Sequence, residues 1–239
     1  MLLVLVQNNE FSLLVGKAYR KLRNLYAYLF GPIMREDRWA KRTLFEIQGS
    51  FTNLNHPHRA FLLEKINNFQ PFDTILEVGC SYGPNLFLLA KRFSKTRIFG
   101  VDINPIAIKE GKKWMAQETI NNVELIYKPP YHFNNFPDKS FDIVFTDALL
   151  MYVPPVKIEN MIKDIIRIAR KGILFLEFHS FSETAHGHAV PDGYIRDYGK
   201  ILGKFLHSSC EIQIQKIPKE AFPSLRWLDY GYLIAAKLR

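Results

Sequence analysis

The feature that most constrains this chain is an alternation of short apolar runs with amphipathic stretches from residue 72 onward. The runs have the length of strands, and the stretches between them have helical spacing. Neighbouring parallel strands need such helical crossovers, so the alternation predicts one doubly wound α/β sheet with right-handed connections. The predicted strands are Thr74–Val78, Arg97–Val101, Val123–Tyr127, Phe141–Thr146 and Ile173–Phe178.

Helix signals stand between the predicted strands. One helix is predicted over Pro84–Phe93, and Asn104 is a suitable N-cap for a second helix that runs to about Thr119. A third helix is predicted to begin at Pro155, and we expect Gly172 to follow its basic C-terminal end.

The C-terminal region has a different pattern. Glu211–Ile217 and Gly231–Leu238 are two more predicted strands, and the connection between them is short for a parallel crossover. We therefore predict an antiparallel C-terminal strand in a seven-stranded, mostly parallel sheet flanked by helices. The segment from Ser180 to Gly193 contains glycine and proline and is predicted to be a loop over the carboxyl edge of the sheet.

The 239 residues, 48% of them hydrophobic, suffice for one substantial core. We predict an N-terminal helical appendage over residues 1–50 and one α/β domain over residues 51–239. Within the appendage, residues 13–30 have the pattern of a basic amphipathic helix, which fits either a lid or contact with an anionic membrane. The lid is the favoured interpretation. Trp39, Phe45 and Phe51 are then expected to wall a substrate pocket.

The net charge of +9 favours an anionic partner, such as nucleic acid, a lipid surface or a phosphorylated compound. Charge alone does not choose among them, and a basic protein without such a partner fits as well. Two cysteines are too few for a disulfide framework and suit a reducing compartment. The apolar run at the start is too short for a secretory signal, and no later run reaches membrane-spanning length. These features predict a cytoplasmic protein.

A glycine-containing turn follows the first predicted strand and leads directly into a helix. Its spacing, acid-x-Gly-x-x-x-Gly, is met by Glu77, Gly79 and Gly83. A turn of this kind lets a ligand approach the backbone amides at the start of a helix. About 20 residues further on, Asp102 ends the second strand, where a carboxylate can accept hydrogen bonds from both hydroxyls of a ribose.

These motifs together resemble those of class I S-adenosylmethionine-dependent methyltransferases, which have a Rossmann-like fold. The resemblance covers roughly residues 50 to 180. The segments that carry it are Ile75–Gly83, Gly100–Asn104, Phe136–Phe145 and Val153–Pro154. The resemblance implies that S-adenosyl-L-methionine is the cofactor. A nicotinamide-dependent oxidoreductase fits less well, because its fingerprint requires glycine where this chain has Ser81 and Pro84.

The resemblance also implies which residues hold the cofactor. Asp102 would contact the ribose, Ile103 would lie against the adenine, and Asp147 would lie near the methionine end. The loop that would hold the methionine part consists of Glu77, Gly79, Cys80, Ser81 and Gly83.

The chain departs from the family pattern in three places. Ser81 stands where many members have glycine, which is a small change. Relatives usually follow the third strand with Gly-Asp, whose acid reaches the adenine, but no acid follows Tyr127 here. An aromatic ring of Tyr131 or Phe133 is one alternative contact for the adenine. Tyr152 stands where related small-molecule enzymes often have a histidine base, and a tyrosine near its reference pKa is a poor base.

The candidate catalytic residues follow the fourth and fifth strands. They are His179, Tyr152 and Asp147. His179 is predicted to act as a base or to orient the acceptor, with Glu177 orienting its imidazole. Asp147 suits either the cofactor or the N-cap of a helix.

The remaining histidines are not predicted to bind metal. His56 and His58 are expected to face the cofactor edge of the sheet, at the start of a helix. His186 and His188 match no metal-ligand spacing and are interpreted as loop residues.

The sequence therefore predicts an enzyme that transfers a methyl group to oxygen of a small-molecule or glycan-type acceptor, which the basic charge allows to be anionic. Two alternatives remain open. One is a non-catalytic protein that binds the cofactor or a partner on the same fold, which the departures at the third strand and Tyr152 favour. The other is an RNA methyltransferase, which fits the charge but lacks an appended RNA-binding module.

Overall fold

The structure is a computed structural model that describes residues 38–51, 53–128, 133, 135–182, 188–190 and 193–238. The predicted amphipathic helix over residues 13–30 lies outside the described residues, as does most of the predicted appendage over residues 1–50. The boundary between the two predicted domains therefore stays a prediction. Among the described residues, no helix is both long and apolar enough to cross a bilayer.

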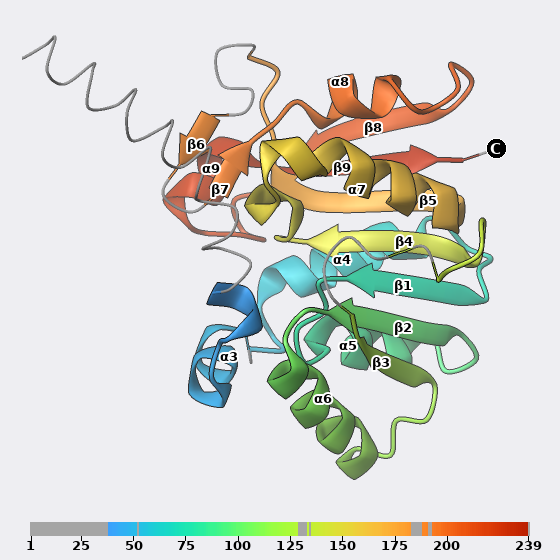
Figure 1. The fold of residues 1–239 in the computed structure, drawn as a ribbon, viewed down its shortest axis with the longest axis vertical. Helices are drawn as coiled ribbons and strands as arrows, with labels where there is room; N and C mark the ends of the chain where they lie inside the picture. The colour runs from blue at the N-terminus through green and yellow to red at the C-terminus, as the bar shows by residue number, and fades with distance from the viewer. Residues whose placement is uncertain are drawn as a thin grey trace, which may run out of the picture.

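A seven-stranded sheet forms the centre of the molecule, in the order β3-β2-β1-β4-β5-β9-β8 (Figure 1). The first five strands along the chain run parallel, and β9 is antiparallel to both of its neighbours, β5 and β8. The predicted fold class is confirmed. The strands are β1 Thr74–Val78, β2 Arg97–Asp102, β3 Val123–Tyr127, β4 Phe141–Asp147, β5 Ala169–Phe178, β8 Glu211–Lys216 and β9 Gly231–Lys237.

Helices cover both faces of this sheet (Figure 1). One buried core joins the sheet to α4, α5, α6 and α9, and a second core joins its other face to α7 and α8. The helices are α3 Leu44–Phe51, α4 Pro57–Asn67, α5 Pro84–Arg92, α6 Pro105–Gln117, α7 Pro155–Ile168, α8 Tyr198–Gly203 and α9 Leu225–Tyr230, with a 3₁₀ turn η1 over Leu150–Tyr152. Strands β1, β4 and β5 are buried on both faces, which explains their continuous apolar runs.

The expectation that Gly172 follows the end of a helix is wrong. Helix α7 ends at Ile168 and β5 begins at the next residue, so Gly172 lies inside the strand. The ring of Phe69 packs against it, and a Cβ added at Gly172 would lie 2.2 Å from the Cε1 atom of that ring. Close packing, rather than helix termination, is the reason for a glycine at this position.

Part of the segment predicted to be a loop is a short hairpin. Strands β6 His188–Val190 and β7 Gly193–Ile195 pair antiparallel, and Arg196 then forms a parallel bridge with His179 at the end of β5. His186 lies outside the described residues. The hairpin therefore follows the carboxyl edge of the sheet as ordered strand rather than as an irregular loop.

Candidate active site

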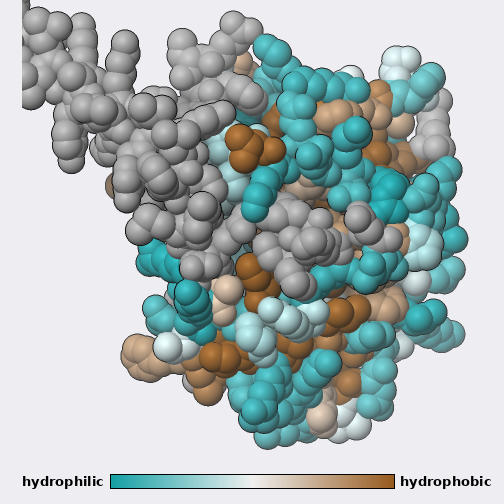
Figure 2. Space-filling model, in the orientation of Figure 1, coloured by the Kyte–Doolittle hydropathy of each residue, from teal (hydrophilic) through white to brown (hydrophobic). Residues whose placement is uncertain are grey.

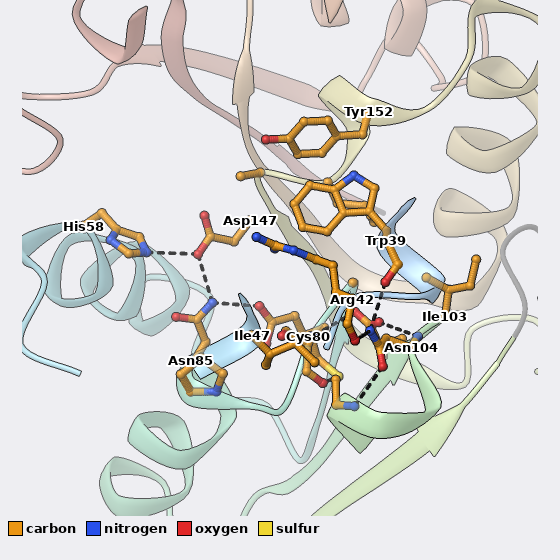
Figure 3. A pocket seen from close by; sticks show the side chains of 18 of the residues that line it. Trp39, Arg42, Ile47, His58, Cys80, Asn85, Ile103, Asn104, Asp147 and Tyr152 are labelled. Atoms are coloured by element: carbon orange, nitrogen blue, oxygen red, sulfur yellow. Dashed lines mark hydrogen bonds and ion pairs between the residues drawn. The ribbon is translucent and has the colours of Figure 1, made fainter. Parts of the chain in front are cut away.

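A cavity of about 380 Å³ lies at the carboxyl ends of β1, β2 and β4, where open α/β sheets place their ligand sites. Figure 3 shows side chains from several elements converging on it, including Ile103 and Asn104 after β2 and Asp147 at the end of β4. Several residues that the sequence analysis singled out line this cavity, but Gly83 does not. They are Glu77, Gly79, Cys80, Ser81, Asp102, Ile103, Asp147 and Tyr152, together with Trp39, His56 and His58.

The glycine loop after β1 is a tight turn against the end of β2. The backbone amides of Gly79 and Cys80 both donate to the carbonyl oxygen of Val101, at 2.8 and 3.1 Å. Gly79 and Gly83 have φ values of 82° and 95°, in the left-handed region that favours glycine. A Cβ at Gly79 would also lie 2.8 Å from Leu149 Cδ1. The loop therefore requires glycine both for its conformation and for its packing.

The carboxylate of Asp102 ties this loop to the start of α6. Its Oδ2 accepts a hydrogen bond from the Ser81 amide and its Oδ1 accepts one from the Asn104 amide, each at 2.8 Å. Burial raises the pKa of Asp102, against these amide hydrogen bonds. The helix cap is Asn104, as predicted, because its Oδ1 accepts from the amides of Ile106 and Ala107 at 2.9 and 3.0 Å. Asp102 is thus not needed as a cap.

Asn104 also brings the segment before α3 to the cavity. Its Nδ2 donates to the carbonyl oxygens of Trp39 and Arg42, at 2.9 and 3.1 Å, and both of those residues line the cavity. Phe45 does not, because its side chain is 86% exposed, and the prediction that it walls the pocket is wrong. Figure 2 shows apolar side chains on the molecular surface over α3. The side chain of Phe51 lies outside the described residues.

A buried polar network lines the other end of the cavity (Figure 3). Asn85 on α5 donates from Nδ2 to Glu77 Oε1 at 2.7 Å and to Asp147 Oδ2 at 3.0 Å, and its Oδ1 accepts from Arg59. The Nε2 atom of His58 lies 3.1 Å from Asp147 Oδ2. Asp147 is therefore engaged by a histidine and an amide rather than acting as a helix N-cap.

The two acids of this network have opposite pKa shifts. Burial, together with the nearby carboxylate of Asp147, raises the pKa of Glu77 to about 8. Burial opposes ionisation of Asp147 too, but His58, Asn85 and Arg59 outweigh it and lower the pKa of Asp147. At neutral pH, Asp147 is thus the ionised member and Glu77 is mainly protonated. Among the described residues, the buried Oε2 atom of Glu77 has no hydrogen-bond partner.

Two buried charged residues hold the η1 turn, which carries Tyr152 into the cavity. Glu177 Oε1 accepts from Thr146 Oγ1 and from the amides of Leu149 and Leu150 at 2.8 to 2.9 Å, and its Oε2 accepts from the Met151 amide at 3.0 Å. The prediction that Glu177 orients His179 is therefore wrong. Instead, its carboxyl group receives the amides at the start of the turn.

Arg196 binds the same turn from its other end. Its Nη1 donates to the carbonyl oxygen of Leu150 at 2.6 Å, and its Nη2 donates to that of Val153. Tyr152 lines the cavity, with its ring 4.8 Å from that of Trp39. The position of the η1 turn that carries Tyr152 therefore depends on Glu177, which the sequence analysis assigned to His179, and on Arg196, which it did not identify.

His179 lies apart from these residues. Its side chain is fully buried and is not among the residues that line the cavity. Its Nδ1 accepts from the amide of Tyr198 at 3.2 Å, its ring contacts Phe181 and Tyr232, and burial lowers its pKa. The structure therefore does not bring His179 together with Tyr152 and Asp147. Within the part of the chain that the structure describes, the histidines that line the cavity are His56 and His58.

Two further predicted positions are packing residues. Cys80 is buried, and burial raises its pKa well above the usual range, so it does not offer a reactive thiolate. Phe133, one alternative contact for adenine, is buried in the core on the α7 face and does not line the cavity. Tyr131 lies outside the described residues.

Comparison with known proteins agrees with this geometry. The model of a family described as a methyltransferase domain matches residues 75–172. The sterol 24-C-methyltransferase of Yarrowia lipolytica is 24% identical over 166 residues, which cover 70% of this chain and 41% of that protein. The chain spans less than half the length of the first curated relatives that it matches.

Solved structures share the fold. The geranyl diphosphate C-methyltransferase from Streptomyces coelicolor A3(2) has a TM-score of 0.61 at 13% identity, covering 83% of this chain and 85% of that one. The cyclase SpnF has a TM-score of 0.59 at 16% identity, covering 74% and 80%. The sheet has the Rossmann-like architecture of these structures, and residues 75–172, which include the glycine loop, match the methyltransferase-domain model.

Proposed function

We propose that this protein is an S-adenosylmethionine-dependent methyltransferase that acts on a small-molecule acceptor, at oxygen. The observation that carries the proposal is the position of Asp102. Its carboxylate lies at the end of β2, beside the glycine loop, and lines the cavity. It accepts hydrogen bonds from the backbone amides of Ser81, Asn104 and Ile103, and the two oxygens of a carboxylate have about four acceptor positions, which leaves room for a ribose hydroxyl.

The other residues of the cavity fit the same cofactor. Ile103 offers an apolar surface for the adenine, and the turn from Gly79 to Gly83 allows close approach of the methionine part. The buried Oε2 of Glu77 has no partner among the described residues. An ammonium group placed beside it would favour the ionised carboxylate, which could then accept its hydrogen bond, with Asp147 nearby. The bound cofactor would supply an electrophilic methyl group on sulfur. The residues of the chain would orient the acceptor towards it and exclude water.

Apolar side chains also line the cavity and are suited to the acceptor. They are Trp39, Leu149, Tyr152, Val153, Phe222 and Trp227. Proteins similar to this chain include a sterol 24-C-methyltransferase, a geranyl diphosphate C-methyltransferase and a phosphoethanolamine N-methyltransferase, so both apolar and anionic small acceptors are compatible with the fold. Arg42 also lines the cavity and would suit an anionic acceptor.

Calorimetric titration with S-adenosylhomocysteine tests the proposal. We expect wild-type protein to bind it and Asp102→Ala to bind about thirtyfold more weakly, which corresponds to about 2 kcal/mol for a charged hydrogen-bonding partner. Asp138→Ala is the matched control, because Asp138 is an exposed acid paired with Arg167 and lies outside the cavity. Equal affinity for Asp102→Ala and the wild type, or no binding to the wild type, would contradict the proposal.

A second candidate function is that of a protein with the same fold that catalyses a different reaction or has no catalytic activity. The similarity to the cyclase SpnF and the lack of an acid directly after β3 favour it. It is distinguished by S-adenosylhomocysteine affinity that persists while no acceptor in a chemically diverse panel gains a methyl group.

A further inference from the structure

Two histidines stand in line with Asp147 at one side of the cavity. The Nε2 atom of His58 lies 3.1 Å from Asp147 Oδ2, and its Nδ1 atom lies 2.6 Å from Nδ1 of His56. Both histidines line the cavity at the start of α4. The remaining ring nitrogen, Nε2 of His56, has no hydrogen-bond partner in the described part of the chain.

The charge of Asp147 determines which ring nitrogens of His58 and His56 carry a proton. An ionised carboxylate only accepts hydrogen bonds, so a neutral His58 must carry its proton on Nε2. Its Nδ1 is then an acceptor, and the 2.6 Å contact requires His56 to donate from Nδ1. The Nε2 atom of a neutral His56 is consequently an unprotonated base at the cavity.

A competing arrangement uses His56 as the N-cap of α4. The backbone amide of His58 lies 3.4 Å from Nδ1 of His56, which would require that nitrogen to be unprotonated and would place the proton on Nε2. A contact of 3.4 Å is at the long limit for a hydrogen bond, whereas 2.6 Å is short. The 2.6 Å contact is therefore the stronger of the two. With His58 neutral it requires His56 to donate from Nδ1, whereas a protonated His58 would let Nδ1 of His56 accept both contacts.

We propose that Asp147, His58 and His56 form a proton-accepting relay, in which His56 Nε2 takes the proton of an acceptor hydroxyl during methyl transfer. The acceptor O–H bond breaks as the Nε2–H bond forms, and the oxygen keeps the electron pair that bonds to the methyl carbon. The pair from the broken carbon–sulfur bond stays on sulfur. The positive charge on His56 is shared with His58 through the Nδ1 contact and is balanced by the carboxylate of Asp147. His56 is the catalytic residue, and His58 and Asp147 position it.

The electrostatics of the relay agree with this assignment. Burial lowers the pKa of His56, and so does the charge of Arg59, against the opposing effect of Asp147. The charged groups that face the relay are Arg59 from α4 and Asp147 from β4, with Glu77 of β1 behind Asp147. His56 is therefore held neutral and able to accept a proton at neutral pH.

The surroundings of the relay indicate the class of acceptor. The ring of Phe222 lies 5.1 Å from that of His56 and 4.9 Å from that of His58, and it stacks on Trp227 at 4.1 Å with an angle of 14°. Both aromatic residues line the cavity. A flat aromatic surface beside a base suits a planar, phenol-type hydroxyl compound, whose ring can pack against Phe222 while its hydroxyl reaches His56. This inference rests on the proposed function and names its acceptor class.

Histidine side-chain ¹⁵N NMR of the complex with S-adenosylhomocysteine tests the relay without a known acceptor. We expect Nε2 of His56 to be unprotonated at neutral pH and to take up a proton on acidification. In Asp147→Asn the midpoint of that protonation should fall by about one pH unit, because an opposite charge is lost. Added phenol should shift the Nε2 signal, and toluene should not. The His56→Asn variant identifies which signals belong to His56. The control is His207→Asn, because His207 is exposed and hydrogen-bonded to Ser209.

Three results would overturn the proposal. A proton on Nε2 of His56 at neutral pH would establish the cap arrangement and leave no base at the cavity. No response of Nε2 to phenol would contradict the acceptor class. Loss of S-adenosylhomocysteine affinity by more than tenfold in His56→Asn or His58→Asn would assign these residues to the cofactor. Failure of the wild type to bind S-adenosylhomocysteine refutes the proposed function instead, and the ¹⁵N spectra of the unliganded protein still report the protonated nitrogen.

Discussion

Replacing Glu177 by glutamine tests whether burial or hydrogen bonding controls the ionisation of this carboxyl group. Burial raises the pKa of Glu177 to about 7, from a usual value near 4.5, against the amides of Leu149, Leu150 and Met151 that stabilise the ionised form. A group whose pKa is higher in the folded state stabilises the fold fully below its unfolded pKa. That stabilisation is lost as the pH rises through the folded value. For Glu177, the loss between about pH 5 and about pH 8.5 is worth roughly 2.5 kcal/mol.

Glutamine cannot titrate, so Glu177→Gln removes this dependence. Its amide nitrogen also cannot accept the Met151 amide, which costs about 1 to 3 kcal/mol at any pH. The variant should therefore be less stable than the wild type at acidic pH. That deficit should shrink, or reverse, by about 2.5 kcal/mol at alkaline pH.

Urea denaturation followed by circular dichroism, at both ends of this pH range, measures the difference between the two proteins. The other titrating groups, including Glu77, are common to both and cancel in the difference. A difference in the free energy of unfolding that stays constant from pH 5 to 8.5 would refute the reasoning. It would mean that the amides of Leu149, Leu150 and Met151 keep Glu177 ionised over this whole pH range.

Two further substitutions test the packing around the cavity. Arg196→Leu leaves the carbonyl oxygens of Leu150 and Val153 without their donor, and we expect a loss of about 3 kcal/mol in urea denaturation; a loss below about 1 kcal/mol would contradict this role. Gly100→Ala would place a Cβ 2.4 Å from Leu86 Cδ1 and 2.7 Å from Cys80 Sγ, so we expect about 1 to 3 kcal/mol of destabilisation in thermal unfolding. Gly203→Ala is its control, because no atom lies within 4 Å of the added Cβ, and equal losses would exclude overpacking as the cause.

Local sequence signals sufficed to predict most of the fold. The apolar runs of β1, β4 and β5 are continuous because both of their faces are buried, and the Asn104 cap is a pattern of neighbouring residues. The position of Gly172 was not predictable in this way. A glycine after basic residues is a common helix end, and the Phe69 ring that requires it comes from about a hundred residues earlier in the chain.

The same distinction applies to the site. The glycine loop and Asp102 are close in sequence, so their spacing predicted that they would meet at the cavity. His58 and Asp147 are 89 residues apart, and only the fold shows that they are hydrogen-bonded. His179 directly follows a central strand, as catalytic residues often do, but β7 and β9 continue beside it and bury its ring. Which histidine lines the cavity depends on how the neighbouring chain segments run. No short sequence motif predicts that.

The place of β9 between β5 and β8 has a consequence for the order in which the sheet is completed. The ribosome makes β8 first, yet β8 pairs only with β9 within the described sheet. The partner strand emerges about 20 residues later, which takes roughly 1 to 4 s of synthesis. During that time β8 has no partner strand, and the open edge of the sheet is β5. On β8, Glu211, Gln213 and Lys216 are exposed, and such polar and charged side chains discourage pairing with another nascent chain until β9 inserts.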